Sequence, residues 1–376
     1  MKNEIISFYY PGDKEIVKSK DCYQYDTEGK EYIDFESGVW CANIGHCNDR
    51  IAKVVEKQAK ESIHHGYRFR NRFSEVLSKE LQRLIGFKNG SSVFLSSGSE
   101  AVNLAITLTR NLTGRKKILK ISNSYISAYG FGQISIENEN LVHVEFNDLN
   151  SIKDIDFSDV SALVLETGGA SVEMVRFPDF EFITQLTDYA KKNNCLIIAE
   201  EVTTGIGRLG KWFGFQHYNV MPDIVVTGKA LGNGFPISAV TISSEITVKF
   251  KQIPFGYAQS HQNDPFGCAI GLEVIKIIEE TDLISISNIV GIYFKKQLEQ
   301  ILNNHKDKVK EVRARGLMLA LEFKSDFDGK NISDSLFENG HVIGFKLNTL
   351  RFLPPLTIKT RDIDKMINKL NSLLKN

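Results

Sequence analysis

Short apolar runs alternate with longer amphipathic stretches between about residues 92 and 275. Six runs rich in β-branched and other aliphatic residues predict strands: SVFL (92–95), KILKI (117–121), ALVLE (162–166), CLIIA (195–199), DIVVT (223–227) and AVTIS (239–243). Between them, EAVNLAITLTR (100–110) and FEFITQLTDYAKKNN (180–194) repeat apolar residues at spacings of three and four, which is typical of helices. The alternation predicts an α/β fold with a mostly parallel sheet that helices cover on both faces.

The last hundred residues follow a different pattern. Helical stretches at 270–281 and 284–304 lead into the strand-like pieces EVRARGLMLALEF and VIGFKLNTLRFLPPL, and a last helix is predicted at 361–374. Near the N-terminus, YQYDTEGKEYIDF carries a Glu-Gly pair that is typical of a hairpin turn. With 376 residues the chain is long enough for two domains. We expect a large domain at 46–275 and a smaller α+β domain from both chain ends, 1–45 and 276–376.

Composition limits the kinds of partner. The 46 Lys and Arg residues balance 46 Asp and Glu residues, so no strong field attracts nucleic acid or anionic lipid. The chain has no apolar run long enough for a signal peptide or a membrane span. Its five cysteines are irregularly spaced, which favours reduced thiols, and the spacing of Cys41, His46 and Cys47 matches no zinc motif. We therefore expect a cytoplasmic protein without a metal site, which acts on small molecules.

Three predicted strand ends carry polar groups that can form one pocket. Lys229 follows DIVVT, Glu200 follows CLIIA, and SSGSE (96–100) joins SVFL to a helix. A lysine in a partly apolar site has a lowered pKa and can form a Schiff base with an aldehyde, and free N–H groups at a helix N-terminus favour a phosphate. Taken singly, these residues are more simply read as a solvated lysine and a serine helix cap. Together they predict a pocket for pyridoxal 5′-phosphate.

The same segments resemble a known family. IIAEEVTTGIGRLGKWFGFQHYNVMPDIVVTGKALGNGFPISAV is similar to the cofactor-site block of the class III aminotransferases. YIDFESGVWCANIGH, VFLSSGSEAVNLAI and LRFLPPLTI are similar to further family segments, in the same order. The resemblance covers nearly the whole chain. It implies a fold type I enzyme with a seven-stranded sheet, pyridoxal phosphate as cofactor, an amino donor and a keto acid acceptor as substrates, and a homodimer with shared active sites.

The resemblance also implies roles for single residues. Lys229 corresponds to the lysine that forms the Schiff base with the cofactor. Glu200 takes the place of the carboxylate that pairs with the pyridine nitrogen, where the family normally has aspartate. The other implied cofactor contacts are the phosphate turn of Gly98 and Ser99, Tyr125 and Val202 against the two faces of the ring, Thr203 near its phenolic oxygen, and Ser260 at the phosphate of the neighbouring subunit.

Two residues are implied at the substrate. Arg351 falls where the family has an arginine that binds a substrate carboxylate, and Trp40 lies in the block that faces the substrate. Members that use 2-oxoglutarate commonly have a further arginine and a glutamate where this chain has Ala128 and Ser171. We therefore expect that this chain does not bind two substrate carboxylates in the way those members do. Two arginines in a segment that borders the active site in relatives are candidate substitutes, Arg68 and Arg70.

Some features of the sequence are also compatible with other functions. The family also contains amino acid racemases and epimerases, which return the proton to the opposite face of the α-carbon, and the expected absence of binding to two carboxylates leaves that reaction open. GIGRLG (205–210) matches the GxGxxG pattern of an NAD-dependent oxidoreductase, but no acidic residue stands at a strand end about 20 positions later. A binding protein without chemistry would have little use for Lys229. We therefore expect transamination, with Lys229 as general base and acid.

Overall fold

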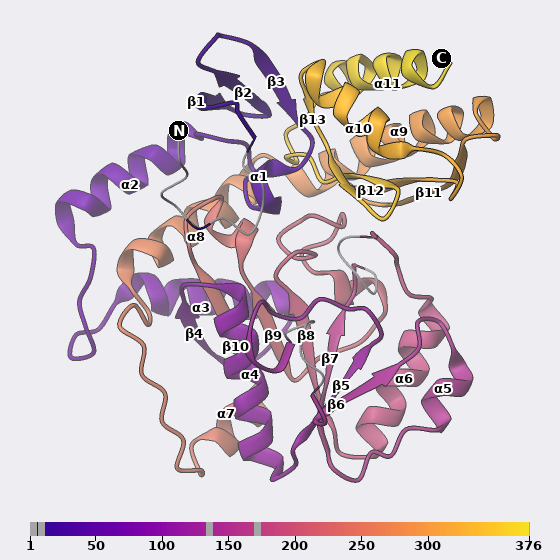
Figure 1. Ribbon diagram of the computed structural model, residues 1–376. Helices are drawn as coiled ribbons and strands as arrows, with labels where there is room; N and C mark the ends of the chain where they lie inside the picture. Colours follow the sequence, from indigo (N-terminus) through magenta and orange to yellow (C-terminus); the bar gives the residue numbers. More distant parts are fainter. Residues whose placement is uncertain (1–5, 7–11, 133–137, 169–173, 376) are drawn as a thin grey trace.

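A seven-stranded sheet forms the core of the lower half of the molecule (Figure 1). The computed structural model describes residue 6 and residues 12–132, 138–168 and 174–375. In the order β4-β10-β9-β8-β7-β5-β6, the strands are Ser91–Leu95, Ser238–Ile242, Ile224–Thr227, Leu196–Glu201, Val160–Glu166, Lys117–Ile121 and Leu141–Val144. The six predicted strands are confirmed to within two residues. The apolar pattern does not predict β6, which has only four residues and exposes His143.

The sheet is mostly parallel, as expected. Strands β9, β8, β7, β5 and β6 run parallel to one another, whereas β10 is antiparallel to both β4 and β9. Helix α4 (Gly98–Thr113) connects β4 to β5, and α6 (Phe180–Lys192) connects β7 to β8. Crossover helices of this kind return the chain to the same edge of the sheet, so the next strand can be parallel.

Strand β7 is apolar along most of its length because both of its faces are covered. Ala162 and Val164 pack in a cluster with α4, whereas Leu163 and Leu165 pack in a cluster with α6. Successive side chains of a strand point to opposite faces, so every residue of β7 is buried.

Both chain ends contribute to the upper part of the molecule (Figure 1). One four-stranded sheet has the order β1-β2-β3-β13, with strands Ile16–Lys20, Tyr23–Asp26, Glu31–Asp34 and His341–Val342. The other has the order β11-β12-β15-β14, with strands Val309–Arg315, Met318–Phe323, Thr349–Phe352 and Gly344–Lys346. The N-terminal hairpin therefore pairs with a C-terminal strand. The division into domains at 46–275 and at 1–45 with 276–376 stays a prediction.

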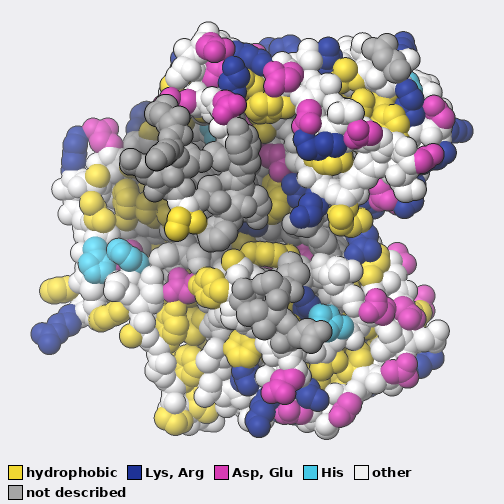
Figure 2. Space-filling view, viewed as in Figure 1, with side chains coloured by type: hydrophobic (Ala, Val, Ile, Leu, Met, Phe, Trp, Pro, Cys, Tyr) yellow, Lys and Arg dark blue, Asp and Glu magenta, His cyan; other side chains and the backbone are white. Residues whose placement is uncertain are grey.

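The remaining helices surround these sheets. They are α1 (Ser37–Trp40), α2 (Asp49–Glu61), α3 (Arg72–Ile85), α5 (Leu149–Lys153), α7 (Ser244–Phe250), α8 (Pro265–Glu280), α9 (Leu283–Asn304), α10 (Gly329–Glu338) and α11 (Thr360–Leu374). Within the described ranges, none of the helices combines the length and apolar character needed to cross a membrane. Positive and negative side chains are interspersed over the face in Figure 2, in line with the balanced charge of the chain.

Candidate active site

Three neighbouring parallel strands bring charged residues to one edge of the sheet. Glu166 ends β7 and is paired in register with Glu200 near the end of β8, while Lys229 lies two residues after β9. The carboxyl ends of parallel strands are the usual place for a ligand in an open α/β sheet. We call the group formed by Lys229, Thr203, Glu200, Glu166 and Trp40 the lysine site.

Lys229 has the tightest polar contact in this group. Its Nζ donates to Thr203 Oγ1 at 2.8 Å and lies 4.6 Å from the centroid of the Trp40 ring. The backbone of Lys229 has φ 41°, in the left-handed region that side chains other than glycine rarely adopt. Strain of this kind is concentrated at functional sites, where the surrounding structure enforces it. The predicted Lys229, Thr203 and Trp40 are thus brought together.

Burial sets the charge of the lysine and of its carboxylate neighbour. Burial lowers the pKa of Lys229, and the nearby charge of Glu200 opposes this by favouring the ammonium. Burial likewise raises the pKa of Glu200 to about 8, against the opposing effect of Lys229. Glu200 Oε1 also accepts a hydrogen bond from Val202 N at 3.2 Å, which anchors its side chain.

Glu166 is a buried carboxyl group of the lysine site. It is 1% exposed. Burial and the charge of Glu200 raise its pKa well above the ordinary value. A hydrogen bond from Ser124 opposes this rise, and a ligand or solvent would complete the remaining positions of the carboxyl group. Sequence reasoning did not select Glu166, although it ends an apolar strand in the same way as Glu200.

The N-terminus of α4 lies against the turn after β8. A Cβ atom on Gly98 would lie 2.6 Å from Val202 Cγ1, so only glycine allows this close approach. Ser99 Oγ accepts from Ala128 N at 2.8 Å and keeps its own proton for donation. Ser97 caps this helix, because its Oγ accepts from Glu100 N at 3.2 Å, so the serine cap is confirmed. The amides before Glu100 have no intrahelical acceptor and favour an anion, and Gly98 and Ser99 stay predicted as a phosphate turn.

Arg351 has a partner that the sequence did not predict. Its Nη2 lies 3.4 Å from Glu36 Oε2, and its Cζ lies 5.2 Å from the centroid of the Trp40 ring. The same indole therefore contacts both Lys229 and Arg351. Burial raises the pKa of Glu36 to about 7, and Arg351 opposes this rise. The only signal for Glu36 was its position within the family block YIDFESGVWCANIGH.

The remaining predicted residues lie on connections between helices and strands. Tyr125 is partly buried in the connection that follows β5. Ser260 is exposed on the loop before α8, and in the described part of the chain no hydrogen bond joins it to Lys229. Arg68 and Arg70 are exposed, and Arg70 forms a bidentate pair with Glu75 at 2.9 Å. Ser171 lies outside the described residues.

The GIGRLG segment folds into turns around a completely buried arginine. Arg208 donates to Leu317 O at 3.0 Å and to Ser37 Oγ at 3.2 Å, and also to the carbonyl of Pro354 and to Asn43 Oδ1. Burial lowers the pKa of Arg208 to about 9. The segment thus ties the large sheet to the two chain ends, and no helix begins there, as a dinucleotide fingerprint would need.

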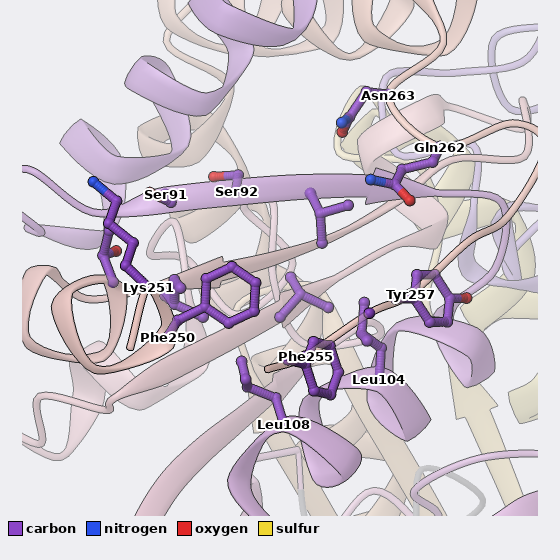
Figure 3. A pocket seen from close by; sticks show the side chains of 15 residues that line it. Ser91, Ser92, Leu104, Leu108, Phe250, Lys251, Phe255, Tyr257, Gln262 and Asn263 are labelled. Carbon is purple, nitrogen blue, oxygen red and sulfur yellow. The ribbon is translucent and has the colours of Figure 1, made fainter. Parts of the chain in front are cut away.

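A separate cavity of about 460 Å³ lies between β4, α4 and the segment that follows α7 (Figure 3). Leu104, Leu108, Phe250 and Phe255 form much of its wall. No residue of the lysine site lines it. The candidate active site is therefore identified by its chemistry and not by this cavity.

Comparison with known proteins gives consistent results over almost the whole chain. The family model for aminotransferase class-III matches residues 10–131 and 127–374. The acetylornithine aminotransferase of Methanocaldococcus jannaschii is 31% identical over 384 residues, which cover 95% of this chain and 92% of that protein.

Solved structures are similar as well. A Bacillus anthracis aminotransferase has a TM-score of 0.92 at 23% identity and covers 99% of this chain, with 95% of its own chain covered. The ornithine aminotransferase of Toxoplasma gondii, whose structure reveals partial occupancy of PLP at the active site, has a TM-score of 0.90 at 23% identity. That match covers 99% of this chain and 92% of the other. The expected fold is confirmed.

Proposed function

Because this chain belongs to the class III aminotransferases and is therefore an aminotransferase, we propose that Lys229 is its catalytic residue and that pyridoxal phosphate is its cofactor. The observation that carries the proposal is the position of the lysine. Its amine lies beside Glu200, is hydrogen-bonded to Thr203, and follows a strand of the central sheet in a strained backbone conformation.

The residues around Lys229 fit the cofactor. The Glu166 carboxyl group is buried near Glu200 and Lys229, whose charges act on its pKa, and Gly98 leaves the start of α4 open to an anion. Gly98, Ser99, Tyr125, Val202, Thr203 and Glu200 would hold the group, in the roles that the family resemblance implies. When bound, pyridoxal phosphate supplies an aldehyde for the substrate amine and an electron-withdrawing ring.

The side chains of the site supply proton transfer. We assign to the Lys229 amine the removal of the proton from the substrate α-carbon as general base, and its later delivery as general acid. Burial lowers the pKa of the lysine, which increases the fraction of neutral amine available for the first task. Thr203 Oγ1, at 2.8 Å, orients Nζ, and Glu200, once ionised, would favour a protonated ring nitrogen although burial raises its own pKa to about 8.

Two residues would bind one end of the substrate. Arg351 would bind a carboxylate and Trp40 would form a wall of the pocket. Ala128 supplies no second guanidinium, so the site favours substrates that do not need a grip on two carboxylates. The name of the Methanocaldococcus jannaschii relative makes N-acetylornithine the first amino donor to test.

A homodimer and a cytoplasmic location belong to the same proposal. Ser260 is exposed on its loop, which is compatible with contact to the cofactor phosphate of a second copy. All five cysteines are free, which supports a reducing compartment. Ser260→Ala should weaken cofactor binding while sedimentation still reports a dimer; an unchanged cofactor affinity would remove Ser260 from the proposed site.

Reduction with borohydride tests the role of Lys229. The protein is incubated with pyridoxal phosphate, reduced and digested, and the modified lysine is identified by mass spectrometry. We expect the modification on Lys229 and its loss in Lys229→Arg. Lys120→Met is the matched control, because Lys120 is another buried lysine whose charge acts on Glu166. Modification confined to other lysines would overturn the proposal.

A second assay separates transamination from racemisation. The protein is incubated with single enantiomers of candidate amino acids, with and without a keto acid. Formation of a new keto acid supports transamination, whereas loss of optical rotation without keto acid identifies a racemase or epimerase.

A further inference from the structure

Two histidines and an aspartate meet outside the lysine site. His64 lies on the loop after α2, and His261 and Asp264 lie on the loop before α8. One potential ligand atom from each of these residues lies within 4.8 Å of the other two. From this geometry we propose that His64, His261 and Asp264 form a binding site for a divalent transition-metal ion such as Zn²⁺.

The carboxylate is already shared between the two imidazoles. Asp264 Oδ1 lies 2.6 Å from His64 Nδ1, and Oδ2 lies 2.6 Å from His261 Nδ1. In the described part of the chain, Asp264 has no lysine or arginine as an ion-pair partner. A bound cation would therefore supply a counter-charge that no described lysine or arginine provides.

The conformation of Asp264 is unusual for its position. It is the N-cap residue of α8, directly before Pro265, and aspartate at this position normally accepts a hydrogen bond from an amide of the first turn. Its side chain makes no such bond and turns to the two imidazoles instead. Asp264 is only 15% exposed, so its carboxylate is held in place.

The backbones that carry the three ligands are fixed relative to one another. The two loops lie side by side at the left of Figure 1, where Tyr67 donates to Gln259 O at 2.8 Å and Asn71 Nδ2 donates to Asn263 O at 2.6 Å. Asn263 N in turn donates to Phe94 O at 2.9 Å, which attaches the second loop to β4. The ligands thus project from a rigid frame, as a metal site requires.

Imidazole nitrogens and a carboxylate oxygen are ligands that Zn²⁺ and its neighbours accept. Bonds of about 2.0–2.2 Å in a tetrahedral site separate ligand atoms by roughly 3.4 Å. Each histidine nitrogen would need to move by less than about 1 Å from the carboxylate oxygen that it contacts, and in the single chain the side chains of His64 and His261 are 44% and 65% exposed. Each imidazole would coordinate the ion through its Nδ1.

The remaining coordination positions have space for water. His261 and Asp264 also line a cavity of about 260 Å³ between the end of β4 and the start of α8. Three protein ligands with open positions describe an exchangeable ion and not a closed structural site. Binding would connect the two loops, and their backbone amides should then exchange hydrogen more slowly.

Zinc binding to the full chain tests the proposal. After equilibrium dialysis at micromolar free Zn²⁺, we expect about one ion per chain by elemental analysis, and an upward shift of the thermal midpoint. Asp264→Asn and His64→Gln should each weaken the affinity about tenfold or more. His143→Gln, which removes an exposed histidine on β6, is the matched control and should have no effect.

Two further measurements keep the result interpretable. Thermal unfolding without zinc checks that each variant is folded. If Asp264→Asn does not fold, the zinc affinity of His64→Gln decides the test. Cys47→Ser removes an exposed thiol, which is a competing zinc ligand. Lack of stoichiometric zinc in the unmodified protein overturns the site. Unchanged zinc affinity in the folded His64 variant, or loss of binding in Cys47→Ser alone, also overturns it.

Discussion

Arg351 and Glu36 form an ion pair beside Trp40, with 3.4 Å between the guanidinium Nη2 and the carboxylate Oε2. Their side chains are 11% and 13% exposed, and Arg351 Nε and Glu36 Oε1 have no hydrogen-bond partner among the described residues. The pair is therefore buried but incompletely satisfied. If Arg351 receives the substrate carboxylate, the substrate competes with Glu36 for the same guanidinium.

Neutralising Glu36 should improve the binding of carboxylate substrates. We expect Glu36→Gln to lower KM for such a substrate about fivefold, corresponding to roughly 1 kcal/mol, and Arg351→Met to raise it. Initial-rate kinetics with a carboxylate donor and its decarboxylated analogue measure the effect. Glu75→Gln, which removes the partner of the exposed Arg70, is the control. A rise of KM in Glu36→Gln would show that Glu36 supports binding and does not compete.

The same pair predicts a pH dependence of KM. Burial raises the pKa of Glu36 to about 7, so Glu36 loses its charge as the pH falls through that value. Its competition for Arg351 then weakens, and KM for a carboxylate substrate should fall towards lower pH. Glu36→Gln has no such titration and should lack this component. If KM depends on pH in the same way in the unmodified protein and in Glu36→Gln, the proposed competition between Glu36 and the substrate is contradicted.

The adjacent Glu200 and Glu201 should respond differently to the same substitution. Glu200 faces Lys229, so Glu200→Gln should lower kcat about a hundredfold or more, while Glu200→Asp keeps the charge and most of the activity. Glu201 accepts from Gly214 N and Phe215 N, each at 2.8 Å. Glu201→Gln places an amide against one of these donors and should cost about 1–3 kcal/mol of unfolding free energy. Enzyme kinetics and denaturant unfolding measure kcat and the free energy of unfolding of both variants. A Glu201→Gln variant with a low kcat and an unchanged free energy of unfolding would contradict this prediction.

The pattern of apolar residues in the sequence predicts most strands of the central sheet. Runs such as ALVLE predict buried strands because both faces of β7 are covered, and the alternation with helices predicts parallel neighbours. Strand β6 was missed because a four-residue strand with an exposed His143 has too little apolar pattern. Long regular elements are thus predictable where burial dictates the residue types.

The site was only partly predictable, because some partners are far apart in sequence. Lys229 and Glu200 were predicted because each follows an apolar strand and lies within the long segment that resembles the family. Glu36 and Arg351 are 315 residues apart, and only the tertiary structure brings them together. The GIGRLG pattern is a different case, since its glycines allow a turn around Arg208 that no spacing rule distinguishes from a nucleotide motif.

Arg208 should therefore matter for stability and not for nucleotide binding. Its guanidinium donates hydrogen bonds to oxygen atoms of Leu317, Pro354, Ser37 and Asn43. Arg208→Met leaves these acceptors unpaired in a buried place, and we expect a loss of about 3–5 kcal/mol in the free energy of unfolding.

Denaturant unfolding of Arg208→Met measures this loss. Arg83→Met is the matched control, since Arg83 is an exposed arginine that pairs with Glu80 and Glu279, and it should cost less than about 1 kcal/mol. Equal effects in the two variants would mean that the buried hydrogen bonds of Arg208 contribute little.

The buried His341 should make the protein sensitive to acid. It is 6% exposed on β13, its ring centroid lies 6.2 Å from that of Phe35, and no described residue is hydrogen-bonded to its Nδ1. Burial, assisted by Lys365 and Lys369, lowers the pKa of His341 to about 4 from its ordinary 6.5. Between these pH values the unfolded chain binds more protons than the folded protein, so the contribution of His341 to stability is complete above 6.5 and is lost as the pH falls towards 4.

Replacement by a residue that does not titrate isolates this effect. The full difference in pKa corresponds to roughly 3 kcal/mol, of which about 1 kcal/mol should be lost between about pH 7 and pH 5.5. We therefore expect the unmodified protein to lose about 1 kcal/mol more than His341→Leu over this range, when both are unfolded by denaturant at each pH. His341→Gln should behave like His341→Leu although it is polar, because only the lost titration matters. If the stabilities of all three proteins change in parallel with pH, His341 is not buried as a neutral imidazole.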